Sequence, residues 1–331
     1  MGGRRTNLAL LLLLATVFLS GWLAFSFYSW PSRFALLLHS LGGLAIVGLL
    51  PWKAMLARRS ALRRGGGAAV VSGLFGLLLL VSLPFGFLHT AGWPNLWTTP
   101  LLSAVPVLRE LTAMDLHVGA AIALVPLLLW HLLARPVKPR ATDLSRRVVL
   151  RAALLLGVSA ATLAALPAGN RRLTGSYREV GLPSTSWMLD PVPSIEVGGW
   201  SLRVGTRSIA YAELAAFEDR ARALLDCTGG WYSEQVWEGA WLSRLLPPAE
   251  LAGALSLSVI SATGYSRRFD LADASRILLA TRVGGRELEP GNGYPVRLVA
   301  PGWRGFWWVK WVSAIRPEAL PWWWQSPYPL Q

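Results

Sequence analysis

Long apolar segments dominate the first half of this chain and constrain its fold more than any other feature. A helix needs about 20 apolar residues to span a bilayer, and five segments meet this length. They are residues 8–28, 34–56, 68–88, 116–133 and 149–166. The first follows a short basic tip but has no small-residue cleavage site, so we interpret it as an uncleaved helix rather than a signal peptide. The sequence therefore predicts a five-helix transmembrane bundle in residues 1–167.

The basic residues predict the orientation of these helices. The chain has 32 Lys and Arg against 18 Asp and Glu, a formal net charge of +14, yet residues 168–331 contain 17 basic and 15 acidic residues. The excess lies in the amino terminus and in residues 53–64 and 135–151. Basic loops stay in the cytoplasm, so residues 168–331 are expected on the periplasmic side of an inner or plasma membrane. This distribution favours the lipid bilayer as a partner and argues against nucleic acid.

Residues 145–151, with the sequence SRRVVLR, precede the fifth apolar segment. They resemble the twin-arginine export signal, placed internally rather than at the amino terminus. The alternative is that two adjacent arginines simply belong to the basic loop. Both interpretations predict the same topology, and neither decides whether the fifth span is cleaved.

All four histidines, His39, His89, His117 and His131, lie in or beside the predicted spans. Ionisable groups are costly there and mark candidate functional sites. Two histidines on facing helices can hold a haem, and His39 with His117 is the preferred pair for a b-type haem. His117 and His131 have the spacing that serves two stacked haems, but Lys53 stands where an inner partner is needed. One outer haem, two haems and a plain anchor remain the alternatives.

Cys227 is the only cysteine in the chain, so it forms no intrachain disulfide and has no partner cysteine for a structural zinc site. It is either a small buried hydrophobic residue or a site. The apolar residues 223–225 precede it, and the polar, glycine-rich residues 228–230 follow. This pattern places the sulfur where a strand ends, accessible to a soft metal.

The remaining sequence predicts a mixed domain. From Ser194 onward, short alternating segments broken by Gly, Pro and Asp indicate strands and turns. Residues 211–225 and 242–251 are predicted helices. Residues 168–331 thus form an α+β domain large enough for one core.

Residues 177–317 resemble the molybdopterin-binding domain of the sulfite-oxidase superfamily, which includes the periplasmic methionine-sulfoxide reductase catalytic subunit. Two blocks carry the resemblance: residues 224–246, which contain Cys227 and the sequence EQVWEGAWLSRLL, and residues 292–310, NGYPVRLVAPGWRGFWWVK. The resemblance implies a sulfite-oxidase-like fold in which Cys227 is the molybdenum ligand. Residues 34–135 resemble a cytochrome-b561-like or ferric-reductase-like bundle in layout and histidine placement.

The same resemblance implies which residues hold a molybdopterin cofactor. Its phosphate tail needs cations and backbone amides, and Arg297 and Lys310 stand at the matching positions. Gly305 is expected to let the chain approach the ligand closely. The other implied cofactor contacts are Asn292, Thr263, Thr185 and Ser186. Each of these residues taken alone is more often a solvated surface residue.

Two further groups of residues have alternative interpretations. Arg267, Arg268 and Arg304 either line an anionic entrance or are solvated. Five tryptophans either wall an aromatic pocket or fill the core: Trp231, Trp237, Trp303, Trp307 and Trp308. The closing segment PWWWQSPYP is a candidate contact with the lipid interface.

The expected activity is oxygen-atom transfer at molybdenum. Sulfite-oxidising members continue after the cysteine to an Asn-Arg pair, and methionine-sulfoxide reductases to an acidic and aromatic stretch; neither is matched here. We therefore expect reduction of an S-oxide or N-oxide, small or protein-bound, with electrons from the membrane quinone pool through a b-type haem. The alternatives are a sulfite-type oxidase, or a non-enzymatic electron conduit or anchor with a degenerate domain.

Overall fold

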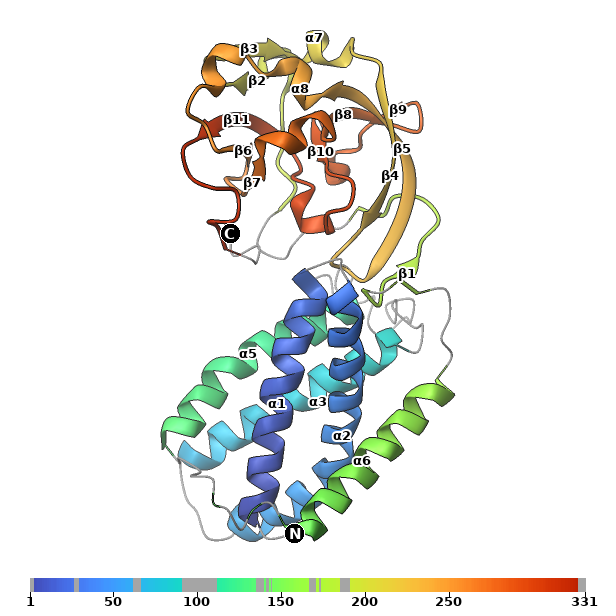
Figure 1. The fold of residues 1–331 in the computed structure, drawn as a ribbon, viewed down its shortest axis with the longest axis vertical. Helices are drawn as coiled ribbons and strands as arrows, with labels where there is room; N and C mark the ends of the chain where they lie inside the picture. The colour runs from blue at the N-terminus through green and yellow to red at the C-terminus, as the bar shows by residue number, and fades with distance from the viewer. Residues whose placement is uncertain are drawn as a thin grey trace. The chain divides into compact units, whose positions relative to one another are not determined.

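The computed structural model describes residues 3–26, 30–61, 67–90, 112–134, 140, 143, 145–166, 171–172, 174–184 and 191–326 (Figure 1). The chain divides into two compact units, Met1–Tyr177 and Arg178–Gln331. Residues 167–170, where the sequence predicts the boundary, lie outside the described part. The first unit is helical and the second is rich in strands.

The first unit contains the five predicted apolar helices. They are α1 (Gly3–Ser26), α2 (Trp30–Ala61), α3 (Gly67–Thr90), α5 (Ala113–Ala134) and α6 (Arg146–Ala165). Each is long and apolar enough to cross a membrane. The helices α2 and α6 begin before the predicted spans because backbone hydrogen bonding continues into the flanking polar residues. The prediction of five apolar helices is confirmed.

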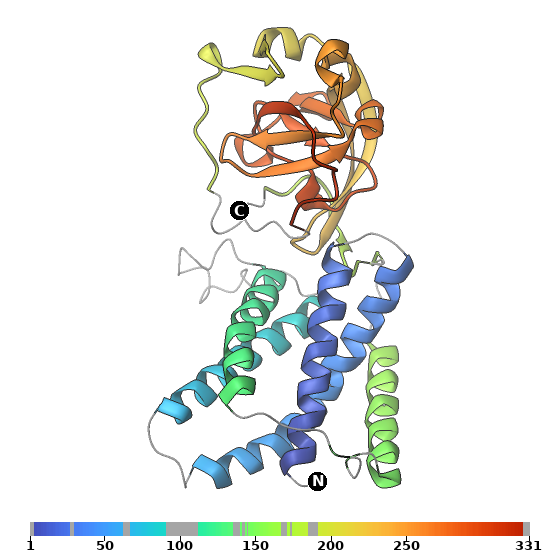
Figure 2. The ribbon, with the colours of Figure 1, turned by 60° about the vertical axis from the view of Figure 1, so that its left-hand side comes forward.

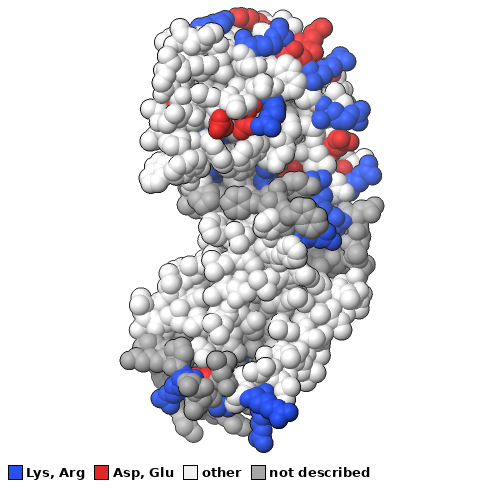
Figure 3. Space-filling model, in the orientation of Figure 1, with Lys and Arg blue, Asp and Glu red and all other residues white. Residues whose placement is uncertain are grey.

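The helices pack in neighbouring pairs, α1 along α2 and α3 along α5, while α6 packs on α2 (Figures 1 and 2). At one end of the unit, Arg4 forms an ion pair with Asp143 at 2.6 Å. Lys53 Nζ donates to Asn7 Oδ1 at 2.6 Å at the same end. The start of α1, the latter part of α2 and the segment before α6 therefore meet, which brings three basic segments together. On the face shown in Figure 3, the middle of this unit lacks Lys, Arg, Asp and Glu.

The second unit contains two sheets. In the described residues, the first has the order β1-β5-β8-β10, with β4 paired to β5 and β9 paired to β8. Its strands are β1 (Tyr177–Arg178), β4 (Asp219–Asp226), β5 (Trp231–Trp241), β8 (Leu278–Val283), β9 (Arg286–Glu287) and β10 (Arg297–Val299). All pairings with a determined register are antiparallel.

The second sheet has the order β3-β2-β11-β6-β7. Its strands are β2 (Ser201–Val204), β3 (Arg207–Ala210), β6 (Ser256–Ser261), β7 (Ser266–Asp270) and β11 (Val312–Glu318). Strand β11 runs parallel to β2 and antiparallel to β6. The short helical elements are α7 (Tyr211–Ala215), α8 (Leu242–Leu245), η4 (Val197–Gly199), η5 (Pro248–Leu251), η6 (Leu271–Ser275), η7 (Pro290–Asn292) and η8 (Gly305–Trp307).

The predicted helix over residues 211–225 is wrong beyond its first turn. Helix α7 ends at Ala215, and β4 occupies residues 219–226. Ala221, Ala223 and Leu225 are buried, while Arg220 and Arg222 are exposed. This two-residue period belongs to a strand. Pairing with β5 overrides the helical preference of an Ala- and Leu-rich segment.

The predicted helix over residues 242–251 is also wrong as one element. It is divided into α8 and η5. Pro247 and Pro248 separate the two, because a proline inside a helix removes a hydrogen-bond donor and clashes with the preceding turn. Both elements follow β5, so they cap the end of that strand rather than cover a sheet.

The core of the second unit lies on the inner faces of its sheets. Leu225, Trp237, Leu279 and Leu298 from the first sheet are at most 2% exposed. Leu202, Val259, Phe269 and Ile315 from the second are fully buried. Strand β4 ends at Asp226, directly before Cys227, so the first sheet positions this residue of the candidate site.

Candidate active site

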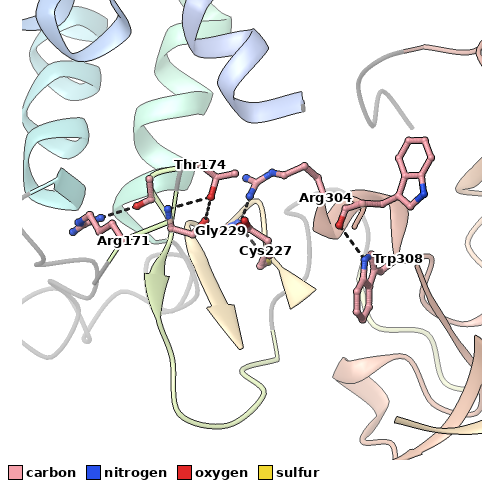
Figure 4. A network of polar contacts seen from close by, with 10 residues as sticks. Arg171, Thr174, Cys227, Gly229, Arg304 and Trp308 are labelled. Carbon is pink, nitrogen blue, oxygen red and sulfur yellow. Dashed lines mark hydrogen bonds and ion pairs between the residues drawn. The ribbon is translucent and has the colours of Figure 1, made fainter. Parts of the chain in front are cut away.

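Cys227 occupies the turn between β4 and β5. Its backbone N–H donates to the Trp231 carbonyl at 2.8 Å, and Gly230 N–H donates back to the Cys227 carbonyl at 3.1 Å. Gly230 has φ of 85°, a conformation that favours glycine. Gly229 N–H donates to Cys227 Sγ at 3.4 Å (Figure 4). The prediction that the cysteine follows a strand and precedes a glycine turn is confirmed.

The segment around Arg304 and Gly305 supports the backbone beside the cysteine. Arg304 donates from its guanidinium to the Asp226 carboxylate, and both side chains are at most 5% exposed. The two residues also form an isolated parallel bridge. The sequence offered two alternatives for Arg304, a solvated residue or one lining an anionic entrance. Both are wrong, because its guanidinium is buried in this ion pair. Its partner Asp226 was not predicted; its place directly before the cysteine was the only available signal.

Arg297 lies buried close to Cys227. Its guanidinium stacks over the rings of Trp237 at 5.5 Å and Trp308 at 5.9 Å. Burial lowers its pKa to about 10, while the nearby Cys227 acts in the opposite direction by favouring the charged form. The structure thus brings the predicted phosphate-binding cation and the predicted molybdenum ligand into electrostatic contact.

Asn292, Arg297 and Lys310 converge on η7. Arg297 donates to the Asn292 carbonyl at 3.0 Å, and Lys310 Nζ donates to the Gly291 carbonyl at 2.6 Å. Asn292 Nδ2 donates to the Leu182 carbonyl at 3.3 Å. Gly293, with φ of 107°, turns the chain there, and a β-carbon on it would lie 3.3 Å from Lys310 Cα. Three residues predicted from one sequence block are therefore gathered in space.

Other predicted contacts have different outcomes. Thr185 and Ser186 lie outside the described residues, although the preceding residue, Ser184, packs against Gly291. Thr263 is exposed on the β6–β7 turn, where its hydroxyl shares a hydrogen bond with Ser261. Gly305 allows a close approach to the backbone of Cys227, while its expected approach to a ligand stays a prediction.

The tryptophans form two clusters. Trp237 and Trp308 meet edge to face at 5.5 Å beside Arg297. Trp303 and Trp307, with ring centroids 4.4 Å apart, pack with Phe269. Trp237, Trp307 and Trp308 are at most 6% exposed, so these three fill the core, as one of the two interpretations holds.

Two of the three arginines considered for an anionic entrance belong to other contacts. Arg267 is buried and lies over the rings of Tyr265, Phe306 and Trp307. Arg268 donates to the Trp324 carbonyl. These contacts attach the closing segment to β7, where Trp323 and Trp324 are more than 60% exposed.

In the helical unit, His39 and His117 lie side by side. Their ring centroids are 5.6 Å apart and their planes meet at 86°. His39 Nδ1 donates to the Val17 carbonyl at 2.8 Å, and His117 Nδ1 donates to the Ser82 carbonyl at 2.7 Å. Each imidazole therefore has its Nε2 lone pair available, the arrangement that metal-ligating histidines commonly have.

Glycines make room for both rings. A β-carbon on Gly21 would lie 2.6 Å from His39 Nδ1, and one on Gly86 would lie 2.6 Å from His117 Nδ1. His89, at the end of α3, is also buried, and the centroid of its ring lies 6.1 Å from that of the Tyr177 ring. The pair preferred from the sequence is thus the pair that the helices bring together.

The residues around Cys227 fit a phosphorylated pterin with a metal. Three of the buried polar atoms that lack a hydrogen-bond partner among the described residues belong to this site: Trp231 Nε1, Asn292 Oδ1 and Arg297 Nε. Such atoms are costly unless a ligand satisfies them. Cys227 supplies a soft ligand, and Arg297 with Lys310 supplies positive charge beside it.

The family comparison agrees with this chemistry, because residues 189–321 match the family described as the oxidoreductase molybdopterin binding domain. A nitrate reductase [NADH] of Spinacia oleracea is 33% identical over 99 residues, which are 25% of this chain and 11% of that protein. The sulfane dehydrogenase SoxCD of Paracoccus pantotrophus shares 22% identity over 39% of this chain and 40% of that chain, with a TM-score of 0.35. This chain thus covers less than half of the length of each of these two proteins. Residues 189–321 are therefore similar to a molybdopterin-binding oxidoreductase domain.

Proposed function

We propose that the protein is a membrane-anchored molybdenum enzyme that reduces an S-oxide or N-oxide with electrons from membrane quinol. The observation that carries this proposal is the placement of Cys227 on a rigid hairpin turn, in electrostatic contact with the buried Arg297. When bound, the molybdenum cofactor supplies oxygen-atom transfer together with storage of two electrons.

In this proposal the residues of the protein bind and orient the molybdenum cofactor. Cys227 ligates the metal, and the Asp226–Arg304 ion pair with Gly305 holds the backbone at the cysteine. Arg297, Lys310 and Asn292 hold the pterin and its phosphate around η7. Thr263, Thr185 and Ser186 remain proposed contacts from the sequence. Cofactor affinity then depends on charge, because a phosphate is held by paired cations more strongly than by neutral donors.

The helical unit is proposed to carry electrons through a b-type haem. His39 and His117 offer two Nε2 atoms on adjacent rings, and both Nδ1 atoms are already bonded to carbonyls. Axial ligation by two histidines from a helical bundle suits a haem that passes single electrons. Quinol from the bilayer is the proposed donor.

The proposed location is an inner or plasma membrane, with residues 168–331 on the periplasmic side. Arg4, Lys53 and the residues before α6 lie at one end of the helices, as expected of cytoplasmic loops. A twin-arginine signal at residues 145–151 is the proposed export route. The oxide substrate, small or protein-bound, is then met outside the cytoplasm.

The test is the metal and pterin content of purified full-length protein, wild type beside Cys227→Ser, with visible spectra of both. We expect about one molybdenum per chain in the wild type, lost in the variant, and the same b-type band in both. Steady-state reduction of dimethyl sulfoxide and trimethylamine N-oxide is then compared with sulfite oxidation. Rapid sulfite oxidation without oxide reduction would contradict the proposed direction. A wild type that contains haem but no molybdenum would contradict the proposed enzyme and support the alternative of a non-enzymatic electron conduit.

A further inference from the structure

The side chain of Trp231 shares a face of the β4–β5 hairpin with Cys227. The register pairs Asp226 with Tyr232, and the bond from Cys227 N–H to the Trp231 carbonyl extends the ladder by one step. Residues directly opposite in an antiparallel pair project to the same side. A β-carbon on Gly229 would lie 3.4 Å from Trp231 Nε1 and 3.7 Å from Cys227 Sγ. The indole nitrogen and the sulfur therefore flank the same glycine.

The indole N–H of Trp231 has no acceptor among the described residues, although the side chain is only 2% exposed. An indole N–H is a donor only, and a buried donor without an acceptor is destabilising. The other tryptophans nearby differ in this respect. Trp237 donates to the Ala223 carbonyl at 3.2 Å, and Trp308 donates to the Trp303 carbonyl at 3.2 Å. Trp231 is thus a buried donor for which the described part of the chain supplies no acceptor.

The donors near Cys227 differ in charge and in their partners. Arg304 is paired with the Asp226 carboxylate. Arg297 donates to the Asn292 carbonyl, although its Nε atom lacks a partner among the described residues. The unpartnered donor that flanks Gly229 together with Cys227 Sγ is the uncharged indole N–H of Trp231. A neutral N–H suits a neutral molecule with a polar oxygen, whereas an oxyanion is held more strongly by a charged donor.

We infer that the Trp231 indole N–H is the substrate-orienting donor of this site, and that it hydrogen-bonds the oxygen of a neutral S-oxide or N-oxide in preference to an oxyanion. This inference rests on the proposed function and specifies its substrate class. In this role Trp231 contacts the substrate oxygen, while Cys227 contacts the metal. The hairpin holds both residues on one rigid turn, so the donor and the metal ligand keep a constant separation.

The test uses full-length, cofactor-loaded protein in four forms: wild type, Trp231→Phe, Trp231→His and Trp241→Phe. Phenylalanine keeps an aromatic ring without the N–H, and histidine keeps a ring N–H. Trp241 lies at the far end of the same strand and is the control. With a reduced viologen dye as donor, we expect Trp231→Phe to raise KM for dimethyl sulfoxide and trimethylamine N-oxide about three- to tenfold, the effect of one neutral hydrogen bond. Trp231→His should recover part of the loss.

A spectroscopic measurement separates a donor from a packing residue. In wild type labelled with [15N]tryptophan, the Mo(V) electron paramagnetic resonance signal should show a coupling to one 15N nucleus. That coupling should disappear in Trp231→Phe and persist in Trp241→Phe. Molybdenum content and thermal unfolding, measured on every variant, show whether an altered KM reflects a damaged site.

The outcomes distinguish this inference from the proposed function. If the wild type reduces oxides while molybdenum-loaded Trp231→Phe retains both KM and the 15N coupling, the inference is wrong and the proposed function stands. Nitrate or sulfite turnover exceeding oxide turnover in the wild type would overturn the neutral substrate class. A wild type without molybdenum would overturn the proposed function, and the inference with it.

Discussion

Gly305 and Cys227 approach so closely that their backbones are in contact. A β-carbon on Gly305 would lie 2.9 Å from Cys227 Cα and 3.0 Å from the Asp226 carbonyl oxygen. Both of these are backbone atoms, so no side-chain rotation relieves the clash. Two segments that are far apart in the chain therefore meet at the turn that carries Cys227, and glycine is the only residue that fits.

Replacing Gly305 with alanine is expected to displace the turn that carries Cys227. We expect a loss of about 1–3 kcal/mol in the free energy of unfolding, the usual cost of overpacking, together with lower molybdenum content. Chemical denaturation and metal analysis measure the two effects. Gly198→Ala is the control, because a β-carbon there meets nothing within 4 Å. Equal stability and metal content in both variants would show that the contact is unimportant.

Removal of the Arg304 guanidinium should be strongly destabilising. Arg304→Met deprives the buried Asp226 carboxylate of its ion-pair partner, which is expected to cost about 3–5 kcal/mol. The double variant Asp226→Asn, Arg304→Met should recover most of this loss, since neither charge then remains. The matched control is Arg244→Met, which breaks an ion pair with Asp219 at the other end of β4. Because Arg244 is 53% exposed, that change should cost at most ~1 kcal/mol.

Cofactor retention should depend on the charge of Arg297. Burial lowers its pKa to about 10, so the guanidinium is charged below that pH and becomes neutral as the pH rises through it. A bound phosphate favours the charged guanidinium, so we expect the holoprotein to keep its pterin at neutral pH and to release it faster only at a pH above the value for the cofactor-free protein. Arg297→Gln should release the pterin readily at every pH. Fluorescence of the released pterin measures this, and a pH profile in Arg297→Gln identical to that of the wild type would contradict it.

The same lowered pKa has an opposite consequence for the cofactor-free domain. Between its pKa of about 10 in the folded protein and the higher ordinary pKa of arginine, the folded protein binds fewer protons at this residue than the unfolded chain does. Stability rises with pH wherever the unfolded state binds more protons. The contribution of Arg297 to stability should therefore increase over this window, and loss of cofactor there reflects lost binding rather than unfolding at this residue.

A haem at His39 and His117 predicts a sharp difference between two glycines of α3. Gly86→Ala places a β-carbon 2.6 Å from His117 Nδ1, whereas the same change at Gly76 meets nothing within 4 Å. We expect Gly86→Ala to lower haem affinity roughly 10–100-fold, as loss of outer-shell support commonly does, and Gly76→Ala to leave it unchanged. Haem titration followed in the visible spectrum measures this. His39→Leu and His117→Leu should each abolish the low-spin b-type spectrum, and its survival in both would exclude this pair.

The sequence alone predicted those structural features whose signal lies in residues close together in the chain. The five apolar helices follow from length and hydropathy, because a bilayer-spanning helix satisfies its own backbone and needs only an apolar surface. The glycine turn that follows Cys227 is also a local signal. In the block from Asn292 to Lys310, Arg297 contacts Asn292 from five residues away, whereas Lys310 reaches the Gly291 carbonyl from 19 residues away.

Only the tertiary structure decided what depends on partners distant in the chain. The β4 segment is a strand rather than a helix because β5 pairs with it, and no local propensity encodes that pairing. Asp226 became a buried ion-pair residue because Arg304, 78 residues later, reaches it. The donor role inferred for Trp231 likewise depends on which acceptors surround its indole. The sequence thus determined which segments form long apolar helices and which residue types are present. Packing decided their neighbours, since the burial of the core and these long-range hydrogen bonds arise between segments.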